Sequence, residues 1–156
     1  MTLLPESVWD YPRPPRLERV AVPVRIDLGG TTVAETREAW RVLETSHPPS
    51  YYLPREAFTC ELLPRPGRSL CEWKGAARYW SLRQGEHLAE DAAWSYPAPT
   101  APFAPIRDHV AVDPARVDAC FVDGERVTPQ PGGFYGGWIT ANLTGPFKGG
   151  PGTQGW

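Results

Sequence analysis

Proline and glycine constrain this chain more than any other residue types, since the 156 residues include 19 prolines and 15 glycines. Proline lacks the backbone N–H that a helix interior needs, and glycine weakens a helix through its conformational freedom. We find no amphipathic helical pattern of about 12 residues, whereas short alternating or β-branched runs recur along the chain. The sequence therefore predicts an all-β fold of short strands joined by turns.

Two hairpins can be placed from their turns. Residues 22–28 and 31–36 flank Gly29-Gly30, a pair that supplies the positive φ of a tight hairpin. Residues 77–83 and 87–96 flank a turn at 84–86. Further short strands are expected at 40–44, 51–53, 58–63, 109–113 and 117–122, with a turn at 64–67. About eight such strands fit two antiparallel sheets.

The chain divides into a core and two extensions. Residues 22–123 hold the expected strands and form the core domain. Residues 1–21 are proline-rich and are expected to form an extended arm on that core, anchored by Trp9 and Tyr11. Residues 124–156 are rich in glycine and proline, but aromatic side chains such as Trp138 are unfavourable in water. We therefore expect this tail to pack on the core, or on a second copy of the chain in a homodimer.

Charge and composition exclude several classes of protein. The net charge is −2, from 16 basic and 18 acidic residues, which argues against a nucleic-acid partner because such proteins need a basic excess. No apolar run of about 18 residues is present, and the first residues lack the pattern of a signal peptide. Cys60, Cys71 and Cys120 are scattered, as are the three histidines, so we expect no disulfide framework, no metal site and no cofactor. Reduced thiols are typical of a cytoplasmic protein.

Large aromatic side chains concentrate in 71–80 and 93–97, on two strands expected to pair. Such rings can line a cavity that holds a planar ring or a cation, and a lysine there can hold an anion. The candidate ligand-binding residues are Trp73, Lys74, Tyr79, Trp94 and Tyr96, with His47 and Tyr51 at the rim. The same pattern also fits a dense aromatic core with Lys74 as a solvated turn residue.

Two further readings remain open. Cys71 close to Lys74, or His47 in a proline-stiffened loop, could serve a small enzyme as nucleophile or as acid and base. No local cysteine-hydrolase signature supports this, and a thiol at Cys71 also fits a small buried side chain. The aromatic tail could instead dock on a protein partner, since exposed aromatics are enriched at interfaces.

The motif Cys71-Glu72-Trp73-Lys74-Gly75, followed by Ala77, Tyr79 and the run Asp91–Pro97, resembles the domain of unknown function 427 family. Ile106 and Val110 continue the match, which covers roughly residues 22–123. Glu72 stands where the family usually has proline.

The resemblance implies a β-tent-like fold, in which two antiparallel sheets meet at an angle. The thalidomide-binding domain of cereblon and methionine sulfoxide reductase B share that architecture. Many β-tent domains hold zinc through two Cys-x-x-Cys pairs, which this chain lacks, so the resemblance carries no zinc over. A nucleotidyltransferase-like label is sometimes given to the family, but the chain shows no paired carboxylates after a Gly-Ser motif. We therefore expect a small-molecule binding module for a cyclic or nucleoside-like ligand.

Overall fold

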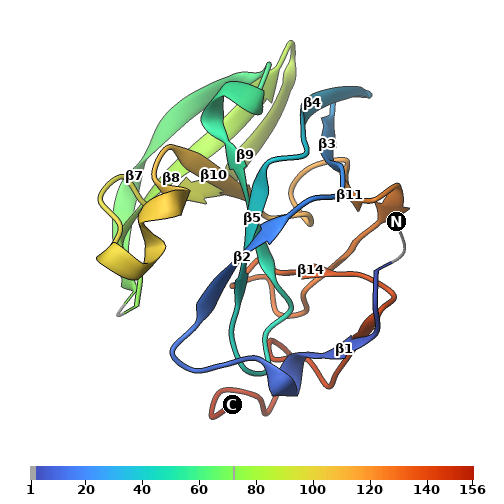
Figure 1. Ribbon diagram of the computed structural model, residues 1–156. Helices are drawn as coiled ribbons and strands as arrows, with labels where there is room; N and C mark the ends of the chain where they lie inside the picture. Colours follow the sequence, from blue (N-terminus) through green and yellow to red (C-terminus); the bar gives the residue numbers. More distant parts are fainter. Residues whose placement is uncertain (1–2, 72) are drawn as a thin grey trace.

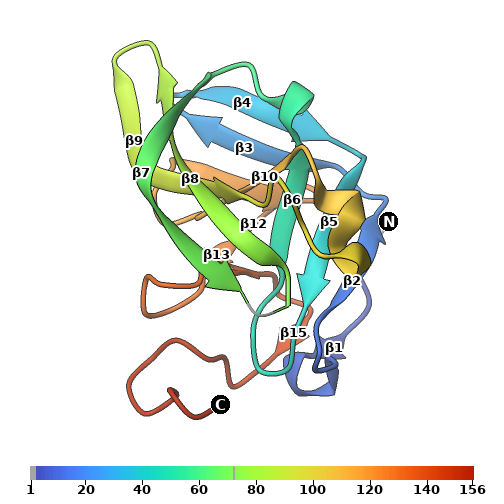
Figure 2. The same ribbon diagram turned by 90° about the vertical axis from the view of Figure 1, so that its left-hand side faces the viewer.

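The computed structural model describes residues 3–71 and 73–156 (Figure 1). Its main sheet has seven strands, and each neighbouring pair in it is antiparallel. The strands follow the order β2 (Arg16–Val20), β5 (Ala39–Leu43), β6 (Ser50–Pro54), β10 (His109–Val112), β9 (His87–Ser95), β8 (Gly75–Gln84) and β7 (Glu61–Cys71). Figure 2 shows β7, β8 and β9 curving along one side of the molecule.

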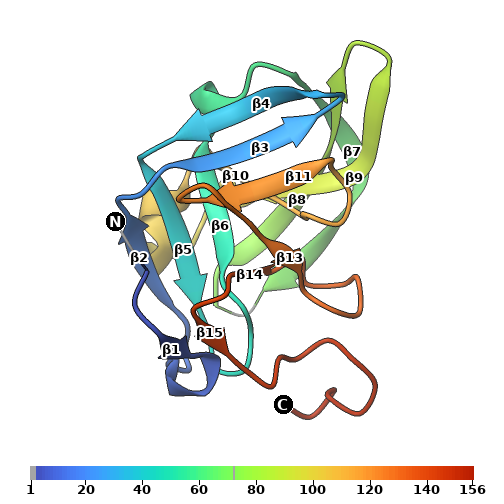
Figure 3. The same ribbon diagram turned by 90° about the vertical axis from the view of Figure 1, so that its right-hand side faces the viewer.

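A second antiparallel sheet crosses the first. Its strands are β12 (Glu125–Arg126), β11 (Ala119–Val122), β3 (Val24–Leu28) and β4 (Thr31–Thr36), in that order. Figure 3 shows β3, β4 and β11 running across the direction of β5 and β6, so the two sheets meet at a steep angle. The predicted all-β class is confirmed. Both predicted hairpins are present, as β3–β4 and β8–β9.

The main core lies between the two sheets. Alternate residues of β3 are buried there, namely Val24, Ile26 and Leu28, as expected for a strand with one covered face. The main sheet contributes Tyr51 and Leu53 from β6, together with residues of β8, β9 and β10. This core holds the two sheets together through apolar burial.

The opposite face of the main sheet carries a second apolar cluster. Tyr52 points to this side because neighbouring residues of a strand face opposite ways. The 3₁₀ helix η3 (Ala101–Ile106) covers part of the cluster with Phe103 and Ile106, both buried. Two shorter 3₁₀ helices, η1 (Val8–Asp10) and η2 (Arg55–Ala57), lie elsewhere. The main sheet is therefore apolar on both faces.

The structure differs from the sequence prediction at 64–67, where a turn was expected. Those residues continue β7, and the pairing register with β8 shifts between Arg65 and Arg68. Prolines can sit in β7 because it is the edge strand of the sheet, where a missing N–H breaks no second ladder. The shift and the positive φ of Gly67 are typical of a β-bulge.

The N-terminal stretch is more than an arm. Residues 16–20 form β2, an edge strand of the main sheet, although the sequence placed them in the extension. Ahead of it, β1 (Glu6–Ser7) pairs in parallel with β15 (Leu143–Thr144) near the C-terminus. Of the two expected anchors, Tyr11 is buried, whereas Trp9 is partly exposed and its indole N–H donates to the Pro146 carbonyl at 2.8 Å.

The C-terminal tail packs on its own core. β13 (Thr128–Pro129) pairs with β14 (Trp138–Ile139). The Trp138 side chain is 0% exposed and stacks on Tyr51 with 4.7 Å between ring centroids. Its indole N–H donates to the Val112 carbonyl at 2.9 Å. One tryptophan of the tail is therefore part of the main core. Among the described residues, no helix is long and apolar enough to span a membrane.

We predict that Trp138→Ala lowers the free energy of unfolding by about 3–5 kcal/mol, because it removes a buried indole and leaves the Val112 carbonyl without its donor. Phe134→Ala is the control, since Phe134 lies in the same tail but is 83% exposed, and it should change stability by less than about 0.5 kcal/mol. Urea denaturation followed by fluorescence measures both. A Trp138→Ala effect as small as that of Phe134→Ala would show that the tail is not part of the cooperative core.

Candidate functional site

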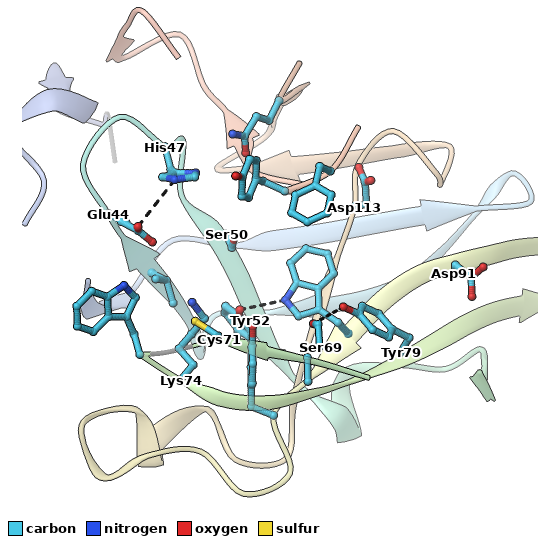
Figure 4. Close-up of a pocket in the computed structure, with 18 of the residues that line it drawn as sticks. Glu44, His47, Ser50, Tyr52, Ser69, Cys71, Lys74, Tyr79, Asp91 and Asp113 are labelled. Atoms are coloured by element: carbon cyan, nitrogen blue, oxygen red, sulfur yellow. Dashed lines mark hydrogen bonds and ion pairs between the residues drawn. The ribbon is translucent and has the colours of Figure 1, made fainter. Parts of the chain in front are cut away.

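A cavity of about 750 Å³ opens on the second face of the main sheet, between the sheet and the C-terminal tail (Figure 4). Its floor and walls come from strands β5 to β9 of the main sheet, from loops next to those strands and from two stretches of the tail. Pockets that hold small organic ligands have volumes of roughly 300–1,000 Å³. The cavity is therefore large enough for a ring compound with substituents.

Aromatic rings from paired strands form one wall. Tyr79 on β8 lies directly opposite Trp94 on β9, so the two rings are neighbours on one face of the sheet. The Trp94 indole N–H donates to the Tyr52 hydroxyl at 3.1 Å, and Tyr96 lies 6.3 Å from Tyr52 between ring centroids. The Tyr79 hydroxyl forms a hydrogen bond with Ser69 of β7. These bonds fix the orientation of the rings.

The hairpin between β7 and β8 brings Lys74 to the cavity. Gly75 has φ +109°, which favours glycine and lets the chain turn back closely. The Lys74 carbonyl accepts a hydrogen bond from the Thr100 N–H at 3.1 Å, which ties the hairpin to the segment before η3. The Lys74 side chain is only 9% exposed, and its ammonium lies 5.6 Å from the centre of the Tyr96 ring and 5.8 Å from that of Phe103. Both distances are within the range of cation–π attraction.

His47 stands at the rim on the loop that joins β5 and β6. Its ring meets the Tyr135 ring edge-on, with 4.7 Å between centroids. Burial and, to a smaller extent, the positive charges of Lys148, Arg13 and Lys74 lower the pKa of His47 to about 4. The Glu44 carboxylate lies 3.9 Å from Nε2 and would favour a charged ring, but Glu44 is itself paired with Arg13 at 3.6 Å. His47 is therefore neutral at physiological pH.

The tail supplies the outer wall. Gln130, Phe134, Tyr135 and Lys148 line it, and the Gln130 amide joins two parts of the tail by donating to the Lys148 carbonyl at 2.7 Å. A Cβ on Gly136 would lie 2.8 Å from the Trp94 ring, so only glycine allows the tail to pass so close to that wall. The close approach closes the cavity on the Trp94 side.

The structure brings most predicted site residues together. Trp73, Lys74, Tyr79, Trp94, Tyr96, His47 and Cys71 all line the cavity. Tyr51 does not, because it points to the main core, where it stacks on Trp138. The strand alternation that sends Tyr52 to the cavity sends Tyr51 to the other face. Glu72, which replaces the usual proline of the motif, lies outside the described residues.

Sequence reasoning missed the contribution of Tyr52, Ser69, Tyr135 and Lys148. Tyr135 and Lys148 lie in a tail whose glycines and prolines gave no strand register to place them. One signal was available: Lys74 and Lys148 are the only lysines of the chain.

The sequence profile of the domain of unknown function DUF427 matches residues 16–123. The chain belongs to the DUF427 family. The match includes β2, in agreement with its place in the main sheet, and ends before the tail that forms the outer wall of the cavity. No curated protein matches the chain.

Two kinds of chemistry at this DUF427 site, metal binding and a cysteine nucleophile, can be compared with the positions of the side chains. Among the described residues, no group of three or more His, Cys, Asp or Glu side chains could hold a metal ion. A cysteine nucleophile needs a base within hydrogen-bond reach. Figure 4 shows the Cys71 side chain well apart from His47, whose neighbours are Glu44 and Tyr135.

We predict that Cys71 is the thiol that reacts first in the native protein. Cys60 and Cys120 are buried, and burial raises the pKa of both thiols, whereas Cys71 is partly exposed at the cavity. Ellman's reagent near pH 8 should modify one thiol quickly, and Cys71→Ser should remove that phase. A rate far above that of free glutathione would favour the enzyme reading, and a fast phase that survives in the variant would contradict the assignment.

The lowered pKa of His47 predicts a pH-dependent stability. In the unfolded chain His47 is protonated below about pH 6.5, whereas in the folded chain it is protonated only below about pH 4. Folding therefore becomes less favourable as the pH falls from 6.5 to 4. The loss is on the order of 3 kcal/mol. His47→Gln removes it, so the difference in unfolding free energy between wild type and variant should change by that amount between pH 7 and pH 4. A constant difference would contradict the prediction.

Proposed function

We propose that this DUF427 protein binds a small cyclic molecule in the cavity between the main sheet and the tail. One observation carries the proposal: rings from the sheet, the β7–β8 hairpin and the tail surround one open space of about 750 Å³. In a dense aromatic core, these rings would pack on one another and leave no such space.

The arrangement of hydrogen bonds supports binding. Tyr52 holds Trp94, and Ser69 holds Tyr79, through groups at the ring edges, so the ring faces stay available. A preformed pocket with fixed aromatic faces suits a flat ring, because little side-chain entropy is lost on binding. A neutral His47 at the rim adds one hydrogen-bond donor and one acceptor.

The alternative that the protein binds a protein partner through its tail has weaker support. Its large side chain Trp138 is buried in the chain's own core, and the Trp9 indole N–H donates to the Pro146 carbonyl of the tail. Among the described residues of the tail, Phe134 is the large hydrophobic side chain that is mostly exposed to water, and it lines the cavity.

The test is a thermal-shift screen of neutral ring compounds, namely nucleosides, cyclic imides and indole. A ligand at 100 times its dissociation constant stabilises by about 2.7 kcal/mol, which raises the melting temperature by roughly 5–10 °C. We expect at least one compound to do so, and Trp94→Leu to remove the shift. Isothermal titration calorimetry then gives the affinity.

Trp80→Leu is the matched control, since Trp80 sits next to Tyr79 on β8 but packs against the main core, on the opposite face from the cavity. The Trp80→Leu variant should still bind the ligand and show the same thermal shift. Tyr79→Leu provides a second cavity variant if Trp94→Leu unfolds. A shift that persists in both cavity variants would place binding elsewhere, and a panel without any shift would count against a site for neutral ring compounds.

A further inference from the structure

The distribution of lysine in this chain is uneven. Of the 16 basic residues, 14 are arginines and two are lysines, Lys74 and Lys148. These two lie far apart in the sequence, one in the β7–β8 hairpin and one in the tail. Both line the same cavity.

The backbone holds Lys148 beside the His47 loop. Its N–H donates to the Ser46 carbonyl at 2.9 Å, and its carbonyl accepts from the Gln130 amide at 2.7 Å. The Lys148 ammonium lies 5.3 Å from the centre of the Tyr135 ring, the same ring that His47 meets edge-on. Both lysine charges reach His47, since both contribute to its lowered pKa. Both lysines and His47 line the same cavity.

The acidic side chains of the cavity do not neutralise these lysines. Glu44 pairs with Arg13 at 3.6 Å, Asp91 with Arg65 at 3.1 Å, and Asp113 with Arg116 at 3.5 Å. Within the described ranges 3–71 and 73–156, neither lysine has a carboxylate within 4.0 Å, and each rests against aromatic rings. Among the described residues, the two lysines are therefore the cavity's basic side chains without an ion-paired carboxylate.

We propose that the natural ligand is an acidic ring compound, whose carboxylate or phosphate is bound by Lys74 and Lys148 while its ring lies against the aromatic wall. This inference rests on the proposed function and names the class of ligand. A partly buried ammonium without a carboxylate is unfavourable, and an anionic group of the ligand relieves this. His47 donates a hydrogen bond to the same group without adding a charge.

The proposal gives the tail a role in specificity. The DUF427 match ends at residue 123, and Lys148 lies beyond it. The family domain supplies the aromatic wall and one ammonium group, and the tail of this chain supplies the other. Lys148 therefore selects acidic ligands over neutral ones of the same shape.

Because the chain has two lysines, labelling of lysine side chains gives signals from these two cavity residues. Reductive methylation with ¹³C-formaldehyde keeps the positive charge and labels the two lysines and the terminal amine, which serves as an internal reference. Phenyl phosphate and benzoate are the acidic probes, and phenol is the neutral one. We expect both lysine signals, assigned by Lys74→Arg and Lys148→Arg, to shift with one common saturation curve when an acidic probe is added, while the terminal signal stays in place.

Calorimetry on the unlabelled protein measures the contribution of charge. Lys148→Met should weaken phenyl phosphate binding about ten-fold or more, and Lys148→Arg should restore most of it. Arg37→Met is the matched control, because Arg37 is exposed and does not line the cavity, yet its loss changes the net charge equally. It should leave the affinity within about two-fold.

The outcomes separate the two proposals. If phenol binds as tightly as phenyl phosphate and Trp94→Leu abolishes both, ring binding holds and the acidic ligand class is overturned. If the lysine signals move without saturation, or only one of them moves, the shared site for an anion is overturned. If acidic probes saturate both lysines but Trp94→Leu has no effect, the anion site holds and the aromatic wall is not the ring-binding surface.

Discussion

The architecture depends on a sheet that is covered on both faces, and strand β6 shows this most clearly. Tyr51 and Tyr52 are neighbours in the sequence, and the geometry of a strand sends them to opposite sides. Tyr51 stacks on Trp138 and so holds the tail to the main core. Tyr52 accepts a hydrogen bond from Trp94 and so orients one wall of the cavity. Two adjacent residues thereby connect the packing of the tail to the shape of the site.

The tail has two roles that use different side chains. Trp138 is buried and anchors the tail, while Tyr135 and Lys148 face the cavity and complete it. Glycine makes this arrangement compact: a Cβ on Gly132 or Gly149 would overlap the backbone of the facing segment, and Gly136 passes close over Trp94. The glycine-rich composition thus reflects a tail that must run close to its neighbours, and the described part of it is ordered against the core.

The sequence predicted the fold class, both hairpins and most of the cavity wall, because alternation and turn residues are local signals. It could not place Pro64–Gly67, where an edge strand tolerates prolines that elsewhere end a strand. It missed β2 as part of the main sheet, since edge strands have short and weak patterns. The sequence predicts Tyr51 at the rim because a run of two tyrosines does not show which of them faces the core. Lys148 was missed because its position depends on contacts with Ser46 and Gln130 that lie far away in the sequence.

The pairing of β1 with β15 brings one segment from near each end of the described chain side by side, and the tail that follows the family domain supplies the outer wall of the cavity. During synthesis the ribosome releases the β7–β8 hairpin long before residue 148. The family domain can begin to fold with its aromatic wall uncovered, and the cavity gains its outer wall only when the tail docks. A ligand held by both parts would then favour the chain with its tail docked over the chain with its tail detached, so that ligand binding and docking of the tail are coupled.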